Sequence, residues 1–208
     1  MSKASDKCLQ RKKLKRKDYK IAIESAIIGM HFDWYIDQKW IQKLYGKYFL
    51  YSELLNATNI YTAYYGDDFA GLMLVNLRNY PKAYHSLAKS LYVKFFDFLE
   101  RKSGNEADIY DMTNDMMLER YEKGNVVDGE ISFLAANPSL KIKGVGRFLL
   151  HCVEQDLQNK KLYLYTDDAC NYGFYEHMHF NRDEAESIIL KLPKGDIPID
   201  CFFYTKEF

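Results

Sequence analysis

The sequence contains few cysteines and few prolines, and its charges cancel. Four residues of each kind occur among 208, and the cysteines are widely spaced with no Cys-x-x-Cys pair: Cys8, Cys152, Cys170 and Cys201. This spacing argues against a disulfide framework or a zinc site and favours reduced thiols in the cytoplasm. Lysine plus arginine and aspartate plus glutamate each total 29, so nothing indicates a general binder of nucleic acid or other polyanions.

Long apolar runs are also lacking. No run approaches the roughly 20 residues of a membrane span, and the first residues are polar and charged, unlike a signal peptide. We therefore expect a cytoplasmic protein without membrane contact. Residues 1–17 are strongly basic. Because the net charge of the chain is balanced, we interpret them as a solvated segment that leads into the first helix, and we expect no nucleic-acid partner.

The chain does have enough apolar residues, 48%, to build one core, and its length fits a single domain over residues 1–208. Periodicity and turn residues predict a mixed α/β domain around one sheet. The expected elements are helices over 18–29 and from 37, strands 59–65 and 69–77 joined by a turn at 66–68, helices from 81 and over 108–123, strand 129–136, a helix after residue 146, strand 162–165, and strands 187–192 and 200–208.

Two of these helices carry further expectations. The helix from 37 should bury an apolar side made of Trp40, Ile41, Leu44, Tyr45 and Phe49. The helix from 81 should open on Pro81 and be broken by Gly104-Asn105.

A glycine turn lies between strand 129–136 and the helix that follows it. Gly144 and Gly146 allow the backbone to approach a ligand closely, and the free N–H groups at a helix start favour an anion such as phosphate. The turn lacks the third glycine of a dinucleotide-binding fingerprint and the Gly-Lys-Ser/Thr of a P-loop. Neither of those nucleotide sites is therefore predicted.

Two motifs together resemble the GNAT superfamily of acyl-coenzyme A-dependent N-acetyltransferases. The segment 141–146, Lys-Ile-Lys-Gly-Val-Gly, is similar to the family's phosphate turn Gln/Arg-x-x-Gly-x-Gly/Ala, with Lys141 in place of Gln or Arg. Downstream, Asn171, the run Phe174-Tyr175-Glu176 and Phe180 resemble the second signature, with His179 where glycine is usual. The resemblance covers roughly residues 127–182 and is loose before them.

The resemblance implies a central, mostly antiparallel sheet of six to seven strands, splayed at the fourth and fifth strands and flanked by helices. It implies transfer of an acetyl group from acetyl-CoA to a primary amine by direct attack in a ternary complex, with no metal. The acceptor stays open between a small-molecule amine and a lysine or N-terminal amine of a protein. A non-catalytic acyl-CoA-binding module is the alternative, and a homodimer through the last strands is a family-level expectation.

The resemblance also assigns residues to the coenzyme. The fourth strand would bind the pantetheine arm alongside its backbone, and the N–H of Leu134 or Ala135 would polarise the thioester carbonyl. The turn would hold the pyrophosphate, with basic side chains adding charge. A basic loop that points at water is the alternative for those side chains. The coenzyme-binding residues are expected to be Phe133, Leu134, Ala135, Lys141, Ile142, Lys143, Gly144, Val145, Gly146, Arg147, Asn171 and Phe174.

Two residues are candidates for proton transfer. In the histone-modifying branch of the family a base glutamate lies fourteen positions before the first turn glycine, which corresponds to Glu130 here. It would take a proton from the amine, which is almost fully protonated at neutral pH. Tyr175 matches the family's acid for the leaving thiolate. A surface glutamate, with a water chain as the base, and a packed aromatic residue are the respective alternatives.

Three other features have weaker functional readings. His177 and His179 lie two apart, so on a helix they point to different sides and make a poor metal pair. Cys170 is a nucleophile candidate only if its thiol is activated, and ordinary packing is commoner. The aromatic segment 30–35, with Asp33, suits an amine acceptor or serves as an anchor for the first helix pair.

Overall fold

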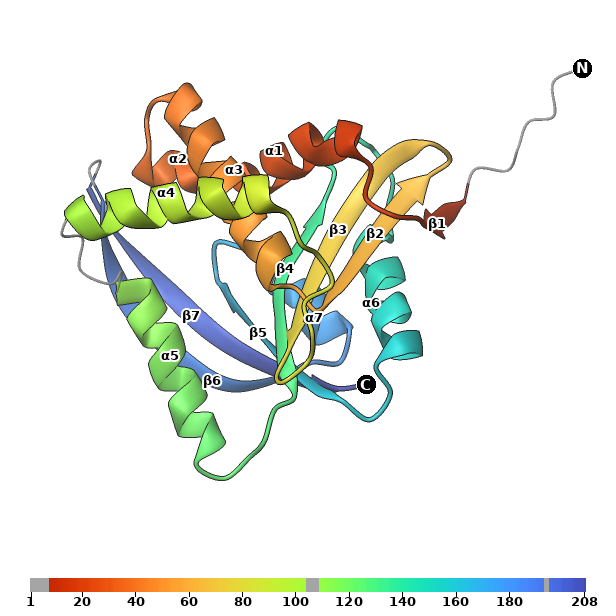
Figure 1. Ribbon diagram of the computed structural model, residues 1–208. Coiled ribbons are helices and arrows are strands. Elements are labelled where there is room, and N and C mark those ends of the chain that lie inside the picture. The colour runs from red at the N-terminus through yellow and green to blue at the C-terminus, as the bar shows by residue number, and fades with distance from the viewer. Residues whose placement is uncertain (1–7, 104–108, 193–194) are drawn as a thin grey trace, which may run out of the picture.

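Seven strands form one sheet in the computed structural model, which describes residues 8–103, 109–192 and 195–208. Their spatial order is β1-β2-β3-β4-β5-β7-β6 (Figure 1). The strands are β1 (Leu9–Arg11), β2 (Asn59–Tyr65), β3 (Asp68–Leu77), β4 (Gly129–Ala136), β5 (Lys161–Asp167), β6 (Asn181–Leu192) and β7 (Gly195–Glu207).

All neighbouring strands are antiparallel except β4 and β5, which are parallel. These two pair only at their first residues, Gly129 with Leu162 and Glu130 with Tyr163. Beyond Glu130 they diverge, so the sheet is split along most of the length of β4. The predicted mixed α/β class, the mostly antiparallel seven-stranded sheet and the splay at the fourth and fifth strands are confirmed.

Helices cover both faces of the sheet (Figure 1). One face packs against α1 and α3, and the other packs against α6; α5 packs against β6 and β7. The helices are α1 (Tyr19–Gly29), α2 (Phe32–Tyr35), α3 (Lys39–Asn56), α4 (Leu87–Ser103), α5 (Ile109–Glu122), α6 (Val145–Asp156) and α7 (Gly173–His177), with a 3-10 turn at Arg16–Asp18.

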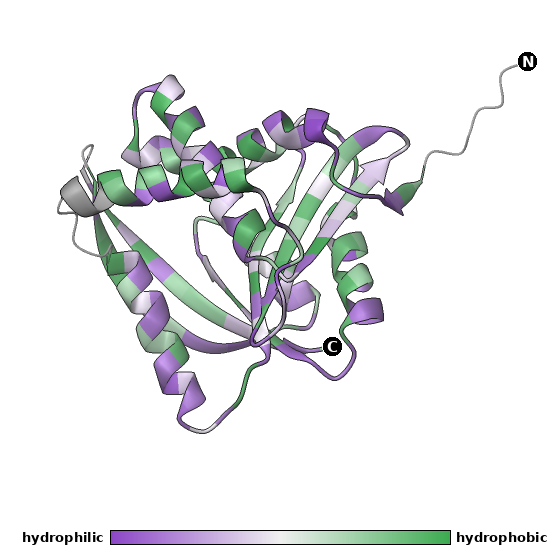
Figure 2. Ribbon diagram, viewed as in Figure 1, coloured by the Kyte–Doolittle hydropathy of each residue, from purple (hydrophilic) through white to green (hydrophobic). Residues whose placement is uncertain are grey.

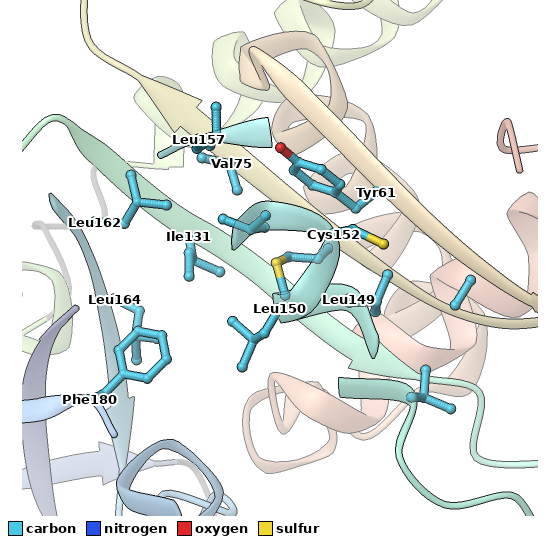
Figure 3. Close-up of a cluster of buried hydrophobic side chains, with 14 of the residues drawn as sticks. Tyr61, Val75, Ile131, Leu149, Leu150, Cys152, Leu157, Leu162, Leu164 and Phe180 are labelled. Atoms are coloured by element: carbon cyan, nitrogen blue, oxygen red, sulfur yellow. The ribbon is translucent and has the colours of Figure 1, made fainter. Parts of the chain in front are cut away.

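The central strand β3 divides its side chains between two cores. Leu72 and Leu74 pack with α1 and α3, whereas Met73 and Val75 pack with α6. This alternation follows from the two-residue period of a strand. Because both faces are covered, β3 is almost continuously apolar, as its hydropathy shows (Figure 2). Figure 3 shows Val75 within the α6-side cluster, beside side chains of α6 and β5.

The N-terminal segment differs in part from its prediction as a solvated lead-in. Residues Leu9–Arg11 form an edge strand that pairs with β2, with Leu9 opposite Tyr65. Arg11 also forms an ion pair of 2.7 Å with Asp156 of α6. The sequence did not predict this strand, because it has only three residues and basic residues flank it. Residues 1–7 of the predicted segment lie outside the described residues.

Two helix predictions also need correction. α4 begins at Leu87 and not at Pro81, because the connection is held to the loop after α3: the Ala83 N–H donates to the Ala57 carbonyl at 2.9 Å. On α3, Trp40 is 65% exposed and Leu44 is also exposed. The predicted break of α4 at residues 104 and 105 lies outside the described residues.

The buried side of α3 centres on Gly46, Leu50 and Leu54, which recur every four residues. Gly46 permits the close approach of α1, since a Cβ there would lie 2.6 Å from Ile27. This contact rotates the helix so that Trp40 and Leu44 fall away from the core. None of the helices within the described residues is sufficiently long and apolar to span a membrane.

Candidate active site

A β-bulge in β4 sets the direction of its side chains. The pairing with β3 shifts there: Leu74 lies opposite Phe133 but Val75 lies opposite Ile131, which leaves Ser132 as the extra residue. Residues two apart on a regular strand share a face. Here Ile131 packs with the α6-side core, whereas Phe133 packs with the α1 and α3 core. The bulge therefore reverses the facing pattern within β4.

This reversal puts Glu130 on the same side as Phe133, facing α3. Phe49 of α3 contacts the ring of Phe133, with centroids 5.9 Å apart. One helical turn further along α3, Glu53 lines the same cavity as Glu130. Burial, and next the nearby charge of Glu53, raise the pKa of Glu130 to about 7. A carboxyl group with that pKa changes its protonation state near neutral pH.

Glu53 is affected in the same direction. Burial raises the pKa of its carboxyl above the ordinary value, and the Ser132 hydroxyl and the Lys82 ammonium offset part of that rise. The two carboxyl groups therefore repel each other at the point where β4 and β5 begin to separate. A pair of acids in such a setting is suited to receive a proton or a cation.

The edge of β4 facing the split offers backbone groups for pairing. Residues 131–136 have no β5 partner, while their other edge is bonded to β3 through pairs such as Met73 with Leu134. Since the N–H and C=O groups of a strand point alternately to its two edges, several of them face the split. An extended amide-containing ligand fits this edge as an added strand would.

The glycine turn lies at the far end of β4. Gly144 has φ +84° and is the N-cap of α6, and its carbonyl accepts from the Phe148 N–H at 2.9 Å. Val145 lies close to Gly71, the residue paired with Ala136 at the end of β4. The N–H groups of the first turn of α6 have no partner within the helix. Free N–H groups at a helix start are suited to bind an anion, and these lie beside the end of the split.

Gly146 joins this turn to the second sequence motif. A Cβ at Gly146 would lie 2.7 Å from the ring of Phe174, so only glycine allows that ring to lie against the first turn of α6. Phe174 lies on α7, which follows β5 after a short loop. The two motifs, about 30 positions apart in the sequence, therefore meet across the split.

One cavity of about 2620 Å³ follows the split and brings most of the predicted residues together. It is larger than the usual range for a single small ligand, about 300–1,000 Å³, and leaves room for a coenzyme and an acceptor. Among the predicted site residues, only Ala135 and Lys141 do not line it. Ala135 packs instead toward the α1 and α3 core, and Lys141 is exposed.

Tyr175 borders the cavity and is firmly packed. Its ring contacts Phe180 and Tyr204, with centroids 5.6 Å and 6.0 Å away. Burial raises the pKa of its hydroxyl above the ordinary value, as do the nearby Cys170 and Asp167. The hydroxyl therefore stays protonated at neutral pH and can donate a hydrogen bond. Tyr175 is therefore a packed aromatic residue, and its role as a donor stays a prediction.

The sequence did not point to the acids and polar groups from α3 and α5. The cavity is also lined by Glu53, Tyr110, Asp111, Asn114 and Asp115. Tyr110 donates to Asp167 at 2.9 Å, which connects α5 to the end of β5. The helix at 108–123 was predicted, but its sequence shows no motif, and only the packing of α5 on β6 and β7 reveals which of its faces meets the cavity.

The remaining candidates from the sequence are the Cys170 thiol and a metal site. Burial, followed by the neighbouring Asp167, raises the pKa of Cys170 to about 12, so its thiol is protonated and inert as a nucleophile. Within the described residues no three His, Cys, Asp or Glu side chains are placed to hold a metal.

The aromatic segment 30–35 serves in two ways. Phe32 anchors it between Tyr45 and Phe49, with ring centroids 5.0 Å and 5.6 Å away. Trp34 and its stacked neighbour His31 line the cavity. The segment therefore anchors the first helices, and its contact with an amine acceptor stays a prediction.

The split parallel pair, the glycine turn and the seven-stranded order define the GNAT fold. No family model and no curated protein matches the sequence. Solved structures do match. A protein of Pyrococcus horikoshii OT3 is 17% identical, covers 96% of this chain and 98% of its own, and has a TM-score of 0.55. An N-acetyltransferase from Staphylococcus aureus Mu50 is 12% identical over 96% and 98%, with a TM-score of 0.51.

A protein of Desulfovibrio desulfuricans assigned to the GNAT family is 14% identical over 96% of this chain and 98% of its own, with a TM-score of 0.50. The chain thus has the fold of GNAT-family N-acetyltransferases over nearly its whole length. Identities this low establish the fold alone, so the reaction has to be argued from the residues of the site.

Proposed function

We propose that this protein transfers an acetyl group from acetyl-CoA to a primary amine by direct attack in a ternary complex. The observation that carries the proposal is the single cavity along the split between β4 and β5, with an anion-binding turn at one end and the Glu130–Glu53 acid pair at the other.

The residues present fit coenzyme A. The first turn of α6 offers free N–H groups, and the exposed Lys143 and Arg147 border the cavity there. The unpaired edge of β4 beyond Glu130 suits the two amides of a pantetheine arm. From Glu130 to Ala136 the strand extends about 20 Å at about 3.3 Å per residue. That length separates the phosphate end from the acid pair.

Glu130 is assigned as the general base. When bound, acetyl-CoA supplies an acyl thioester whose carbonyl carbon accepts the amine. Glu130 removes the ammonium proton, which frees the nitrogen lone pair for the new C–N bond. A carboxyl group with a pKa of about 7 is a stronger base than an ordinary glutamate, and it is largely ionised at slightly alkaline pH.

Tyr175 is assigned to the leaving group. The C–S bond breaks as the amide forms, and the thiolate leaves with the bonding pair. The Tyr175 hydroxyl can donate a hydrogen bond to the departing thiolate, whose conjugate acid has an ordinary pKa near 8.5. The raised pKa of Tyr175 keeps the hydroxyl protonated and favours this hydrogen bond over full transfer of the proton, which the thiol gains from solvent.

A titration with acetyl-CoA tests the coenzyme assignment first. At about 100 times the dissociation constant a ligand stabilises by about 2.7 kcal/mol, which raises the melting temperature by several degrees at most. An unchanged melting temperature at millimolar acetyl-CoA would contradict the proposal. Release of coenzyme A thiol with a panel of amines then tests catalysis. If Glu130→Gln and Tyr175→Phe both leave turnover unchanged, the catalytic assignment is wrong, and binding without turnover favours a non-catalytic acyl-CoA-binding module.

A further inference from the structure

Carboxylates gather at the end of the cavity remote from the glycine turn. Glu53 and Glu130 meet there, and Asp115 of α5 lines the same cavity. The charge of Asp115 is close enough to contribute to the raised pKa of Glu130. The glycine turn, where Lys143 and Arg147 lie, is about 20 Å away along β4. The cavity therefore has a basic end and an acidic end.

Arg78 and Lys82, whose charges offset part of the rise in the pKa values of Glu130 and Glu53, are also engaged with other groups. Arg78 forms an ion pair with Glu122. The Lys82 ammonium donates to the Asn56 carbonyl at 2.6 Å and to Asn76 Oδ1 at 2.8 Å. Within the part of the chain that the structure describes, the lysine and arginine residues lining the cavity are Lys143 and Arg147, at its other end. A cation bound at this end would favour the ionised forms of Glu53 and Glu130, whose pKa values are raised in its absence.

A buried amide supplies a second and independent observation. Asn114 of α5 lines the cavity and is only 8% exposed, and its Oδ1 accepts no hydrogen bond from any described residue. Burying an acceptor without a donor is unfavourable. An ammonium group, which carries only donors, would satisfy this oxygen, and the next residue, Asp115, lines the same cavity with a carboxylate.

Aromatic rings also line the cavity. Tyr165 of β5 lies near the acidic end, where the charges of Glu130 and Asp115 help to raise its pKa, and Tyr110, Trp34 and Phe49 line the same cavity. Ring faces attract cations and also pack against methylene groups. Together with the carboxylates they favour a flexible chain that bears positive charges, and they disfavour an anionic or zwitterionic acceptor.

We propose that the acceptor is an aliphatic diamine or polyamine. One nitrogen would be acetylated beside Glu130, and a second ammonium would be held by Asp115 and Asn114 of α5. This inference rests on the proposed acetyl transfer. It excludes a lysine side chain of a protein as the preferred acceptor, because that chain carries a single ammonium.

Calorimetric titration of the purified protein tests the binding claim without acetyl transfer. The probes are α,ω-diamines from 1,3-diaminopropane to 1,6-diaminohexane, each paired with the n-alkylamine of the same carbon count. The second charge–charge contact should make the best diamine bind about tenfold or more tightly than its monoamine, which corresponds to about 1.4 kcal/mol. Equal affinity for both members of every pair would overturn the proposal.

Substitutions on α5 test where the second ammonium group of the diamine binds. Asp115→Asn and Asn114→Leu should each lower the preference for the diamine over the monoamine about tenfold or more, while the melting-temperature shift caused by acetyl-CoA stays the same. Glu119→Gln is the matched control, because Glu119 is exposed on the same helix and does not line the cavity. A diamine preference that survives both α5 substitutions contradicts the assignment, even if either variant turns over acetyl-CoA normally.

The outcomes separate this inference from the proposed function. Diamine binding without any effect of acetyl-CoA leaves the cation site standing and rejects the acetyl transfer. Acetylation of monoamines or of a lysine peptide with kcat/KM equal to that of diamines supports acetyl transfer and rejects the diamine site. Acetylation of diamines with a higher kcat/KM, lost in Asp115→Asn, supports both.

Discussion

The Phe174 ring lies against Gly146 so closely that a Cβ on the glycine would come within 2.7 Å of it. Gly146 belongs to the first turn of α6 and Phe174 to α7, on the two sides of the split between β4 and β5. The ring thus closes the side of the anion-binding turn. The contact also explains why a glycine is required at this helical position, whose backbone angles any residue could adopt.

Gly146→Ala is expected to push this ring out of place. Overpacking of this kind costs typically about 1–3 kcal/mol of unfolding free energy, and the displaced ring should weaken acetyl-CoA binding about tenfold or more. Chemical denaturation and calorimetric titration measure the two effects. Gly124→Ala is the control, since a Cβ there meets nothing within 4 Å and Gly124 does not line the cavity.

A second substitution distinguishes the ring contact from a backbone effect. Phe174→Leu removes the far ring atoms, so the double variant Gly146→Ala/Phe174→Leu should recover part of the stability that Gly146→Ala loses. Strictly additive losses in the two single variants would show that the two residues do not interact, in contradiction to the contact.

Gly144 should tolerate asparagine better than other residues. Its φ of +84° lies in the left-handed region, and a Cβ there meets nothing within 4 Å, so backbone conformation alone decides the effect. Gly144→Asn should cost less unfolding free energy than Gly144→Ala, and Gly144→Val should cost most, since β-branched residues rarely adopt this region. Thermal and chemical denaturation measure the series. Equal stability of all three variants would contradict the assigned conformation.

The pH dependence of catalysis should report Glu130. Its pKa, raised to about 7 by burial and then by Glu53, predicts that kcat/KM rises with pH through a midpoint near 7 and levels about one pH unit higher, once the carboxylate has formed. Glu53→Gln removes the like charge, so the midpoint of the rise should move to lower pH. Glu130→Gln should remove this limb together with most of the activity. A midpoint unchanged in Glu53→Gln would contradict the coupling.

The pH dependence of the unfolding free energy provides an independent measure of the Glu130 titration. A glutamate whose pKa is raised in the folded state binds its proton more tightly there than in the unfolded chain. Its favourable contribution is complete below the unfolded pKa near 4.5 and is lost as the pH rises through about 7. The wild-type protein should therefore lose more unfolding free energy than Glu130→Gln between these two pH values, as denaturation at each pH will show.

The sequence was sufficient for the fold class and for the order of most elements. It was also sufficient for two motifs, because strand alternation, the turn glycines and the 171–176 run are local signals. The bulge at Ser132 was not predictable, since nothing in the β4 sequence reveals that Ile131 and Phe133 face opposite sides. Nor was the partner of Glu130, a residue of β4, because Glu53 lies 77 positions away on α3. Sites built by packing of distant elements require the three-dimensional structure.

The basic end of the cavity yields the last prediction. Lys143 and Arg147 are exposed and line the cavity beside the α6 turn, so they should contact coenzyme phosphates through charge-assisted hydrogen bonds. Such bonds contribute about 1.5–3 kcal/mol, and exposure reduces this toward its lower limit. Lys143→Ala and Arg147→Ala should each weaken acetyl-CoA binding about tenfold, and the loss should shrink as salt rises.

Lys123→Ala is the matched control for this pair, because Lys123 is exposed after α5 and does not line the cavity. Calorimetric titration at low and high salt measures each affinity. Losses that are equal at both salt concentrations would show that the two side chains act through local packing of the turn and not through charge. Since the N–H groups of the α6 turn bind phosphate without either side chain, the double variant should keep measurable affinity for acetyl-CoA, while Gly146→Ala, which displaces the Phe174 ring, should weaken binding at every salt concentration.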